Sequence, residues 1–182
     1  MISRESAYEL VEKNLGSRNL VKHVIATEAV MRALAYRLEQ DGDVWAMAGL
    51  LHDLDYETTK DRFEDHALKT VEMLKDEDVS DEIKDAILAH CNRKNREKLI
   101  EKAIYAADPV TGFIVAAVLI RKGTKLSDID VEFLINRFKE KSFARGASRE
   151  QMESCEELGL SLEEFLSLSL EAMKGISTEL GL

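Results

Sequence analysis

The sequence has very little of what interrupts a helix. In 182 residues it holds one proline, Pro109, and nine glycines. Strands usually need glycine and proline in the turns between them, so the signals for a sheet are sparse. Apolar residues instead recur at helical spacing along much of the chain. We therefore predict an all-α fold.

Cysteine is also scarce, and no apolar run is long. The two cysteines, Cys91 and Cys155, are too few for a disulfide framework, and nothing near the start resembles a signal peptide. The longest apolar run, 113–120, has eight residues, whereas a membrane-spanning helix needs roughly 20. These absences favour a cytoplasmic protein that does not span a membrane. Cys91 is interpreted as structural, because no base is placed beside it.

Basic residues are also fewer than acidic residues. The chain has 25 Lys and Arg against 35 Asp and Glu, and its formal net charge is −10. Binding to nucleic acid or to an anionic membrane needs a basic surface, so the composition argues against both as partners. The hydrophobic share of 45% is enough for one core. The oligomeric state stays open, because neither a heptad repeat nor a broad apolar patch stands out.

Apolar periodicity and capping residues predict roughly nine helices in a single bundle. The segments with the clearest pattern are 17–40, beginning at Ser17; 43–51, leading into His52 and Asp53; 61–74, carrying His66; a helix from Ser80 that carries His90; 96–107; 130–139; and two short helices beginning at Ser148 and Ser161. After residue 107, Pro109 either opens a new helix capped by Asp108 or kinks one continuous helix.

Each of the four histidines lies on or beside a predicted helix with apolar neighbours: His23, His52, His66 and His90. A single histidine on an apolar face is more often hydrogen-bonded in a core than bound to a metal, and for His66 alone this interpretation is favoured. As a set, however, four imidazoles with the carboxylates of Asp53 and Asp108 suit one or two divalent transition metals. Because His52 and Asp53 are adjacent, they can share a metal only where their helix ends.

The order of these residues resembles the motif of the HD superfamily. The segment "AGLLHDLDY" is similar to the "LLHDIG" helix end of that superfamily, and "IYAADPV" is similar to the helix that bears its last aspartate. The resemblance covers about 21–111, and "KGTKLSDIDVEFLINRFKEKSFARGASRE" resembles a group of uncharacterised predicted hydrolases. We therefore expect a single-domain helical bundle over 1–182, with a metal-binding core at about 18–125 and a C-terminal helical extension at about 126–182.

The resemblance also implies the metal ligands. The implied ligands of a first metal are His23, His52, Asp53 and Asp108. In binuclear members two further histidines hold a second metal and the aspartate of the pair bridges both, which here implies His66, His90 and Asp53. The expected cofactor is one or two divalent ions of iron, manganese, nickel or zinc. Tyr56 stands where a nucleotidase variant has a glutamate, so that variant is less favoured.

These ligands predict a metal-dependent phosphohydrolase. A water shared by two metals would be acidified toward hydroxide and attack the phosphoester of a small metabolite or nucleotide, with Asp53 as the catalytic bridge. Phosphoryl oxygens also need cations, and 139–149 is a basic stretch in an acidic chain. Lys141 and Arg145 are therefore the candidate substrate-binding residues. An equally weighted interpretation is that this stretch only solvates a loop.

Two other functions stay open at this point. A few members of the HD superfamily activate oxygen at a di-iron pair held by the same six ligands, so a di-iron oxygenase is one alternative. The other is a non-catalytic, metal-stabilised nucleotide-binding module. Thr111, three residues after Asp108 and so on the same face of a continuous helix, either lines the pocket or packs in the core.

Overall fold

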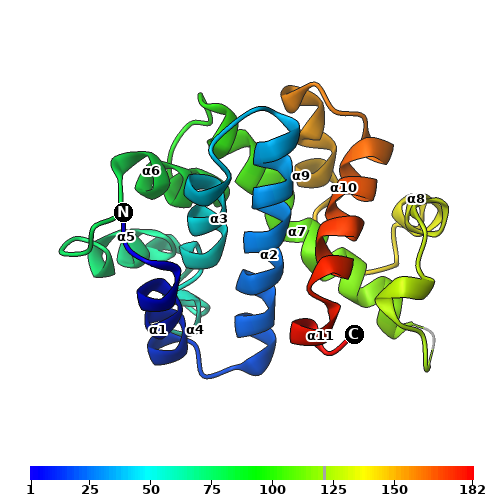
Figure 1. The fold of residues 1–182 in the computed structure, drawn as a ribbon, viewed down its shortest axis with the longest axis horizontal. Helices are drawn as coiled ribbons and strands as arrows, with labels where there is room; N and C mark the ends of the chain where they lie inside the picture. Colours follow the sequence, from blue (N-terminus) through cyan, green and yellow to red (C-terminus); the bar gives the residue numbers. More distant parts are fainter. Residues whose placement is uncertain (121) are drawn as a thin grey trace.

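The structure is a computed structural model that describes residues 1–120 and 122–182, and within these ranges it consists of helices without a strand (Figure 1). The predicted all-α class is confirmed. The α-helices are α1 (Arg4–Asn14), α2 (Arg18–Arg37), α3 (Gly42–Leu51), α4 (Tyr56–Thr59), α5 (Leu68–Met73), α6 (Asp81–His90), α7 (Leu99–Leu119), α8 (Val131–Lys139), α9 (Arg149–Glu153), α10 (Leu162–Gly175) and α11 (Ser177–Leu180). Three 3-10 helices join them: η1 (Phe63–Asp65), η2 (Leu126–Asp128) and η3 (Ser154–Leu158).

Helices α2 and α3 pack closely at the centre of the bundle (Figure 1). Ser17 precedes α2 as expected, and Asp41 begins α3 by accepting the backbone N–H groups of two following residues. Gly49 allows the close approach, because a Cβ added there would lie 2.7 Å from the backbone oxygen of Thr27 on α2. Only glycine fits where two helix backbones are this near. The ends of α2 and α3 that carry His23 and His52 are thereby held together.

Helix α7 is continuous over 21 residues with Pro109 inside it, so the expectation of one continuous helix is correct and a new helix capped by Asp108 is not formed. Proline has no N–H, and the carbonyl four residues earlier, that of Tyr105, therefore loses its helical donor. The side-chain Nε2 of Gln151 on α9 donates to this carbonyl at 3.4 Å. The proline thus frees a main-chain acceptor that a later helix uses for docking.

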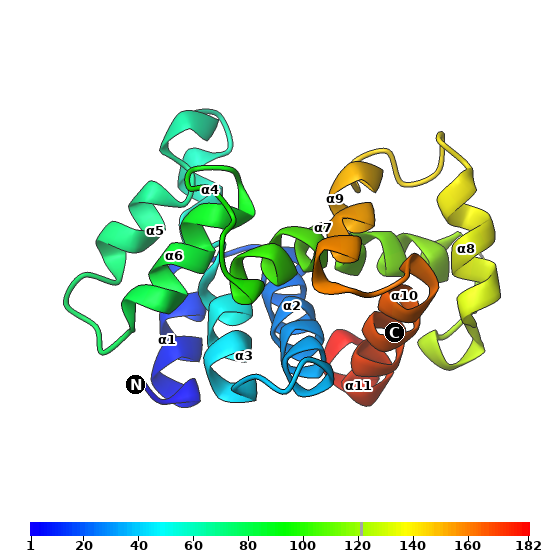
Figure 2. The same cartoon turned by 90° about the horizontal axis from the view of Figure 1, so that it is seen from above.

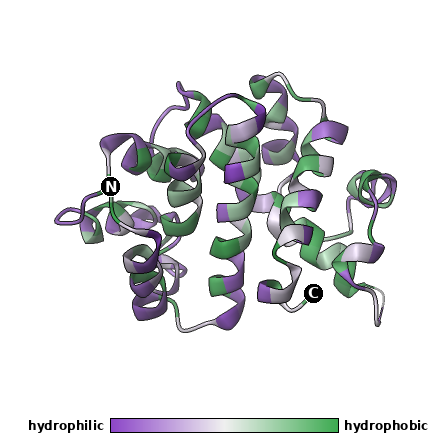
Figure 3. Ribbon diagram, viewed as in Figure 1, coloured by the Kyte–Doolittle hydropathy of each residue, from purple (hydrophilic) through white to green (hydrophobic). Residues whose placement is uncertain are grey.

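The length and apolar character of α7 would also suit a membrane span, but 67% of its most apolar window is buried inside the protein. Phe113 and Ile104 are fully buried on it. The ribbon in Figure 3 is coloured by hydropathy, and most residues of α3 and α7 are buried. A buried helix of this kind is expected at the centre of an α-helical core.

The predicted helix over 61–74 is wrong in its first half. Only 68–73 is α-helical, and His66 lies in extended backbone between η1 and α5, next to Ala67, which has a positive φ of 66°. The hydrogen bonds of Asp55 explain the break. Its side chain accepts the backbone N–H of Thr70, while Thr70 Oγ1 accepts the backbone N–H of Asp55. Tertiary bonds therefore override the local helical pattern.

The C-terminal helices α8 to α11 lie along one side of the molecule, and α7 runs from the half formed by α1 to α6 into this second half (Figure 2). Helix α10 packs against α2, and α9 packs against α7. Ser148 and Ser161 cap α9 and α10 through their side chains, as the sequence predicts. The division into a core ending near residue 125 and an extension stays a prediction.

Candidate metal centre

The six residues predicted as metal ligands meet at one place. They lie on α2 (His23), directly after α3 (His52 and Asp53), in the segment before α5 (His66), at the end of α6 (His90) and within α7 (Asp108). Apart from the adjacent His52 and Asp53 they come from separate parts of the sequence, and the close packing of α2, α3, α6 and α7 brings them together.

The four imidazoles form two pairs. The Nε2 atoms of His23 and His52 are 3.2 Å apart, and those of His66 and His90 are 3.1 Å apart. Asp108 belongs to the first pair, since its Oδ1 lies 3.1 Å from Nε2 of His23 and 3.7 Å from Nε2 of His52. Two nitrogens at such a separation are spaced as two ligands of one ion with bonds of about 2.0–2.1 Å.

Asp53 lies between the two pairs. Its Oδ1 is 3.4 Å from Nε2 of His66 and 3.6 Å from Nε2 of His90, while its Oδ2 is 3.6 Å from Nε2 of His23. Oδ1 is also 3.6 Å from Nε2 of His52, so this oxygen lies near three of the four rings while Oδ2 faces His23. This is the position that a carboxylate bridging two ions would take.

The opposite ring nitrogen of every histidine has a hydrogen-bond acceptor. The partners of the Nδ1 atoms are Thr111 Oγ1 for His23 at 2.9 Å, the Gly49 carbonyl for His52 at 2.8 Å, Asp55 Oδ1 for His66 at 2.8 Å, and the Ile87 carbonyl for His90. The Thr111 hydroxyl donates to the Asp108 carbonyl, so it accepts from His23. A proton on Nδ1 leaves the lone pair on Nε2, which is the arrangement that metal-binding histidines adopt.

Two groups of this buried site, His52 and Asp53, have strongly shifted pKa values. Burial disfavours the charged ring of His52, but the carboxylates of Asp53 and Asp108 outweigh it and raise the pKa of His52 to about 9. Burial likewise opposes ionisation of Asp53, yet His52 and His90 hold the pKa of this carboxyl well below its usual range. Asp53 is therefore an anion at neutral pH, and without a metal the neighbouring imidazoles have to balance its charge.

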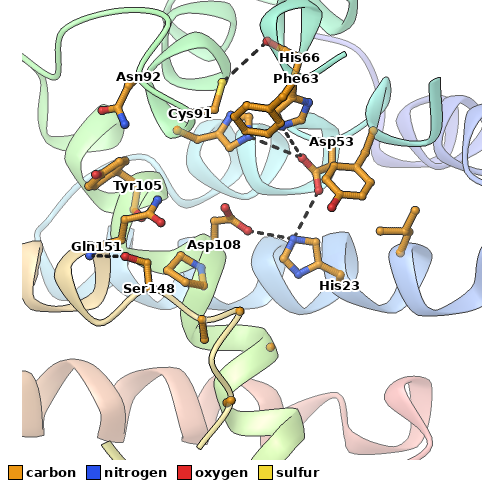
Figure 4. A pocket seen from close by; sticks show the side chains of 18 of the residues that line it. His23, Asp53, Phe63, His66, Cys91, Asn92, Tyr105, Asp108, Ser148 and Gln151 are labelled. Carbon is orange, nitrogen blue, oxygen red and sulfur yellow. Dashed lines mark hydrogen bonds and ion pairs between the residues drawn. The ribbon is translucent and has the colours of Figure 1, made fainter. Parts of the chain in front are cut away.

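The site opens on one side only. The side chains of His23 and Asp108 are 21% and 28% exposed, whereas His52, His66 and His90 are at most 3% exposed. The exposed edge faces a cavity of about 670 Å³ that also reaches α9 (Figure 4). His23 and Asp108 are therefore the most exposed residues of the centre, and His66 and His90 also line the cavity, whereas His52 does not.

The two predicted substrate-binding cations are not brought to this cavity. Lys141 and Arg145 are exposed and are not among the residues that line it. The same loop instead contributes Ala144, Gly146 and Ala147 to the lining. A role for Lys141 and Arg145 in substrate binding stays a prediction.

Arg149, in the same basic stretch, uses its side chain for contacts within the protein. Its guanidinium donates to loop carbonyls, the shortest bonds being 2.7 Å to Phe143 and 2.9 Å to Ala147. It also lies 4.7 Å from the ring centre of Phe113 and 5.3 Å from that of Phe138. Burial lowers the pKa of Arg149. This cation shapes the loop that forms one wall of the cavity.

Sequence reasoning missed the role of Asp55 and left that of Thr111 open. Asp55 is fully buried and accepts from Nδ1 of His66, and Thr111 is 1% exposed and accepts from Nδ1 of His23. The signal for Asp55 was its place two residues after Asp53 in an apolar environment, where a third carboxylate needs a buried donor.

A known protein family has a sequence model that matches the part of the chain carrying this centre. The model of the HD domain matches residues 20–112, which is just over half of the chain and includes all six residues of the centre. The chain therefore belongs to the HD-domain family, whose members are typically metal-dependent hydrolases. The finer subgroup suggested by the C-terminal segment stays a prediction. Among solved structures, none matches the chain.

The donor set fits a divalent metal. Groups of histidine and aspartate whose ligand atoms lie within 4.8 Å of one another include His23 with His52 and Asp108, and Asp53 with His52 and His90. Imidazole nitrogen with carboxylate oxygen suits iron, manganese, nickel or zinc better than magnesium. HD domains bind divalent metals, and this chain has the groups to hold them.

Proposed function

We propose that this protein is a cytoplasmic metal-dependent phosphohydrolase that cleaves the phosphoester of a small metabolite or nucleotide. The observation that carries the proposal is the arrangement of two imidazole pairs on either side of Asp53, each with its Nδ1 atoms already bonded. Six ligands in this arrangement suit two ions. We therefore propose a binuclear centre in which Asp53 bridges both.

Different residues of the chain would have different roles in such a reaction. Bound divalent cations supply a water of lowered pKa and positive charge for the phosphoryl oxygens. Asp53 stays ionised, with Oδ1 near His52, His66 and His90 and Oδ2 toward His23. His23 and Asp108 form the exposed edge at which a phosphate would arrive. Tyr56 and Phe63 line the cavity and contact the ring of His66.

Cys91 lines the same cavity but does not serve as a nucleophile. Burial raises the pKa of its thiol to about 11, so the thiolate is a minor form at neutral pH. Its sulfur is 3.8 Å from the carbonyl of His66, to which it donates. This agrees with the structural role expected from the sequence and leaves the metal centre as the source of chemistry.

The test is phosphate release by purified protein. Protein stripped of metal and reloaded with manganese, iron, cobalt, nickel or zinc is assayed with p-nitrophenyl phosphate and with a panel of phosphorylated metabolites. We expect turnover with at least one ion, and its loss in His52→Ala and Asp53→Asn. The matched control is Asp76→Asn, the same change at an exposed carboxylate outside the cavity. Elemental analysis should give up to two ions for each chain.

Two results would contradict the proposal. Inactivity of every metal form on the whole panel would refute the proposed hydrolase activity. Oxygen consumption by the iron-loaded protein would favour the di-iron oxygenase instead. The predicted cations are tested in the same assay. Replacement of both Lys141 and Arg145 by alanine should raise KM if they bind the substrate, and an unchanged KM would assign them to the solvated loop.

A further inference from the structure

The cavity has a second polar wall that faces the metal centre and has no part in binding metal. It is formed by Asn92, which follows α6, by Tyr105 on α7, and by Ser148 and Gln151 at the start of α9. In Figure 4 these four residues lie on the opposite side of the cavity from His23, Asp53 and His66. We call them the distal wall.

Asn92 offers donors to the cavity. Its side-chain Oδ1 accepts from Nη1 of Arg96 at 2.5 Å, and because arginine can only donate, the amide orientation is fixed. The two N–H groups of Asn92 are left for another acceptor. Arg96 is held in turn by its position 3.7 Å over the ring of Tyr105. Asn92 has a positive φ of 62°, which places it at a turn just after His90.

Gln151 and Ser148 supply an acceptor and a further donor. Nε2 of Gln151 donates to the carbonyl of Tyr105, which leaves Oε1 of the same amide to accept. Oγ of Ser148 accepts the backbone N–H of Gln151, which leaves its hydroxyl proton to donate. The distal wall therefore presents donors from Asn92 and Ser148 beside an acceptor from Gln151.

The distal wall is electrically neutral on its cavity side. The two arginines behind it are already bound to protein groups, Arg96 to Asn92 and Tyr105, and Arg149 to loop carbonyls. None of the described residues that line the cavity is a lysine or an arginine. A second phosphate or a carboxylate at this wall would therefore find no lysine or arginine among the lining side chains to pair with directly.

We propose that the distal wall binds the leaving group of the substrate, and that this group is neutral and carries several hydroxyls. A hydroxyl both accepts and donates, so neighbouring hydroxyls satisfy Asn92, Ser148 and Gln151 together. A sugar phosphate and the ribose of a nucleoside monophosphate share this chemistry. The inference rests on the proposed phosphohydrolase function, because it assumes that the phosphoryl end lies at the metals.

The kinetic test compares substrates that share a phosphate and differ in the leaving group. The probes are ribose 5-phosphate, adenosine monophosphate, fructose 1,6-bisphosphate and p-nitrophenyl phosphate, which has no hydroxyls to offer. We expect kcat/KM to be higher for a polyhydroxylated monophosphate than for the bisphosphate. Asn92→Asp turns the donors into an acceptor at constant volume, and Arg96, which already contacts Oδ1, offsets the added negative charge. It should lower kcat/KM for the preferred monophosphate by roughly ten-fold, the effect of one or two lost hydrogen bonds. Hydrolysis of p-nitrophenyl phosphate should change little.

The matched control is Asn95→Asp, the same change three residues later at an exposed position outside the cavity. Gln151→Leu is a second variant, which removes the Oε1 acceptor together with the Nε2 donor to the Tyr105 carbonyl. Equal loss on p-nitrophenyl phosphate and on the sugar phosphates would overturn the proposal, because it would show that the variants damage the metal centre. Preference for the bisphosphate would overturn it as well.

A binding experiment separates this inference from the proposed function. The side-chain amide signals of Asn92 and Gln151 are identified in nitrogen-15 NMR spectra of the zinc-loaded protein by their loss in Asn92→Asp and Gln151→Leu. Ribose 5-phosphate should shift both signals, and p-nitrophenyl phosphate should not. Shifts without any hydrolysis would refute the phosphohydrolase and support the distal wall as a binding site. Hydrolysis of the sugar phosphate without these shifts would refute the distal wall alone.

Discussion

Replacement of Gly49 by alanine tests whether helix packing sets the metal centre. The added Cβ would lie 2.7 Å from the backbone oxygen of Thr27, whereas ordinary contacts begin near 3.4 Å, so α2 and α3 must separate by about 0.7 Å. In this movement His23 would be displaced together with α2, and His52 together with α3. Ligand positions in metal sites tolerate about 0.2 Å. The displacement is several times larger, and the two Nε2 atoms, now 3.2 Å apart, would no longer fit one ion.

Two quantities should change in Gly49→Ala. Overpacking of a core costs about 1–3 kcal/mol, and alanine returns about 0.5–1 kcal/mol as the better helix former. The free energy of unfolding without metal should therefore fall by about 0.5–2 kcal/mol. Metal affinity should fall at least ten-fold or so, the loss that misplaced ligands commonly produce. Urea denaturation measures the first quantity, and competition with a chromophoric chelator measures the second.

The matched control for this change is Gly175→Ala. Gly175 also lies in a helix, but a Cβ there meets nothing within 4 Å. This variant should be as stable as the parent or slightly more so, with unchanged metal affinity. If Gly49→Ala bound metal as tightly as Gly175→Ala does, the close approach of α2 and α3 would not be what positions His23 and His52.

Three further predictions concern the surroundings of the metal. Thr111→Val removes the acceptor of the His23 Nδ1 proton, so metal affinity should fall about 10–100-fold while the fold is retained; an unchanged chelator titration would contradict this. Arg149→Lys keeps the charge but loses most of the hydrogen bonds to the loop. It should lower the free energy of unfolding by about 2 kcal/mol while metal uptake is preserved, and a loss of metal binding would contradict this prediction. Because the pKa of His52 is raised to about 9, its protonation stabilises the metal-free protein fully below about pH 6.5, and this stabilisation disappears as the pH rises toward 9. Metal affinity should increase over the same interval as the competing proton leaves, and titrations between pH 6.5 and 9 that showed the opposite slope would refute the assignment.

Much of the fold could be predicted because its signals are local. Ser148 and Ser161 cap helices at the expected places, and His90 lies on the inward face of the helix that starts after Ser80. The scarcity of proline and glycine indicated long helices, and α7 is one of them. Each of these features depends on residues only a few positions apart.

The parts that could not be predicted depend on contacts between distant segments. The helical pattern around His66 failed because Asp55 bonds the backbone of Thr70 and the ring of His66. Lys141 and Arg145 were chosen by charge alone, and charge does not tell which side chains of a loop face inward. The order of the histidines predicted which residues would meet, but their spacing in the sequence could not give the distances between the rings.

Pro109 has a consequence for the motion of the protein. A helix that lacks one ladder bond bends more readily at that point than elsewhere, and here the missing bond would join residues 105 and 109, so the turn that bends contains Asp108. A bend there would move the second half of α7 and the helices packed on it, and Thr111, which accepts from His23, would move with them. The chain's one proline therefore couples the width of the cavity to the position of two residues that contact His23.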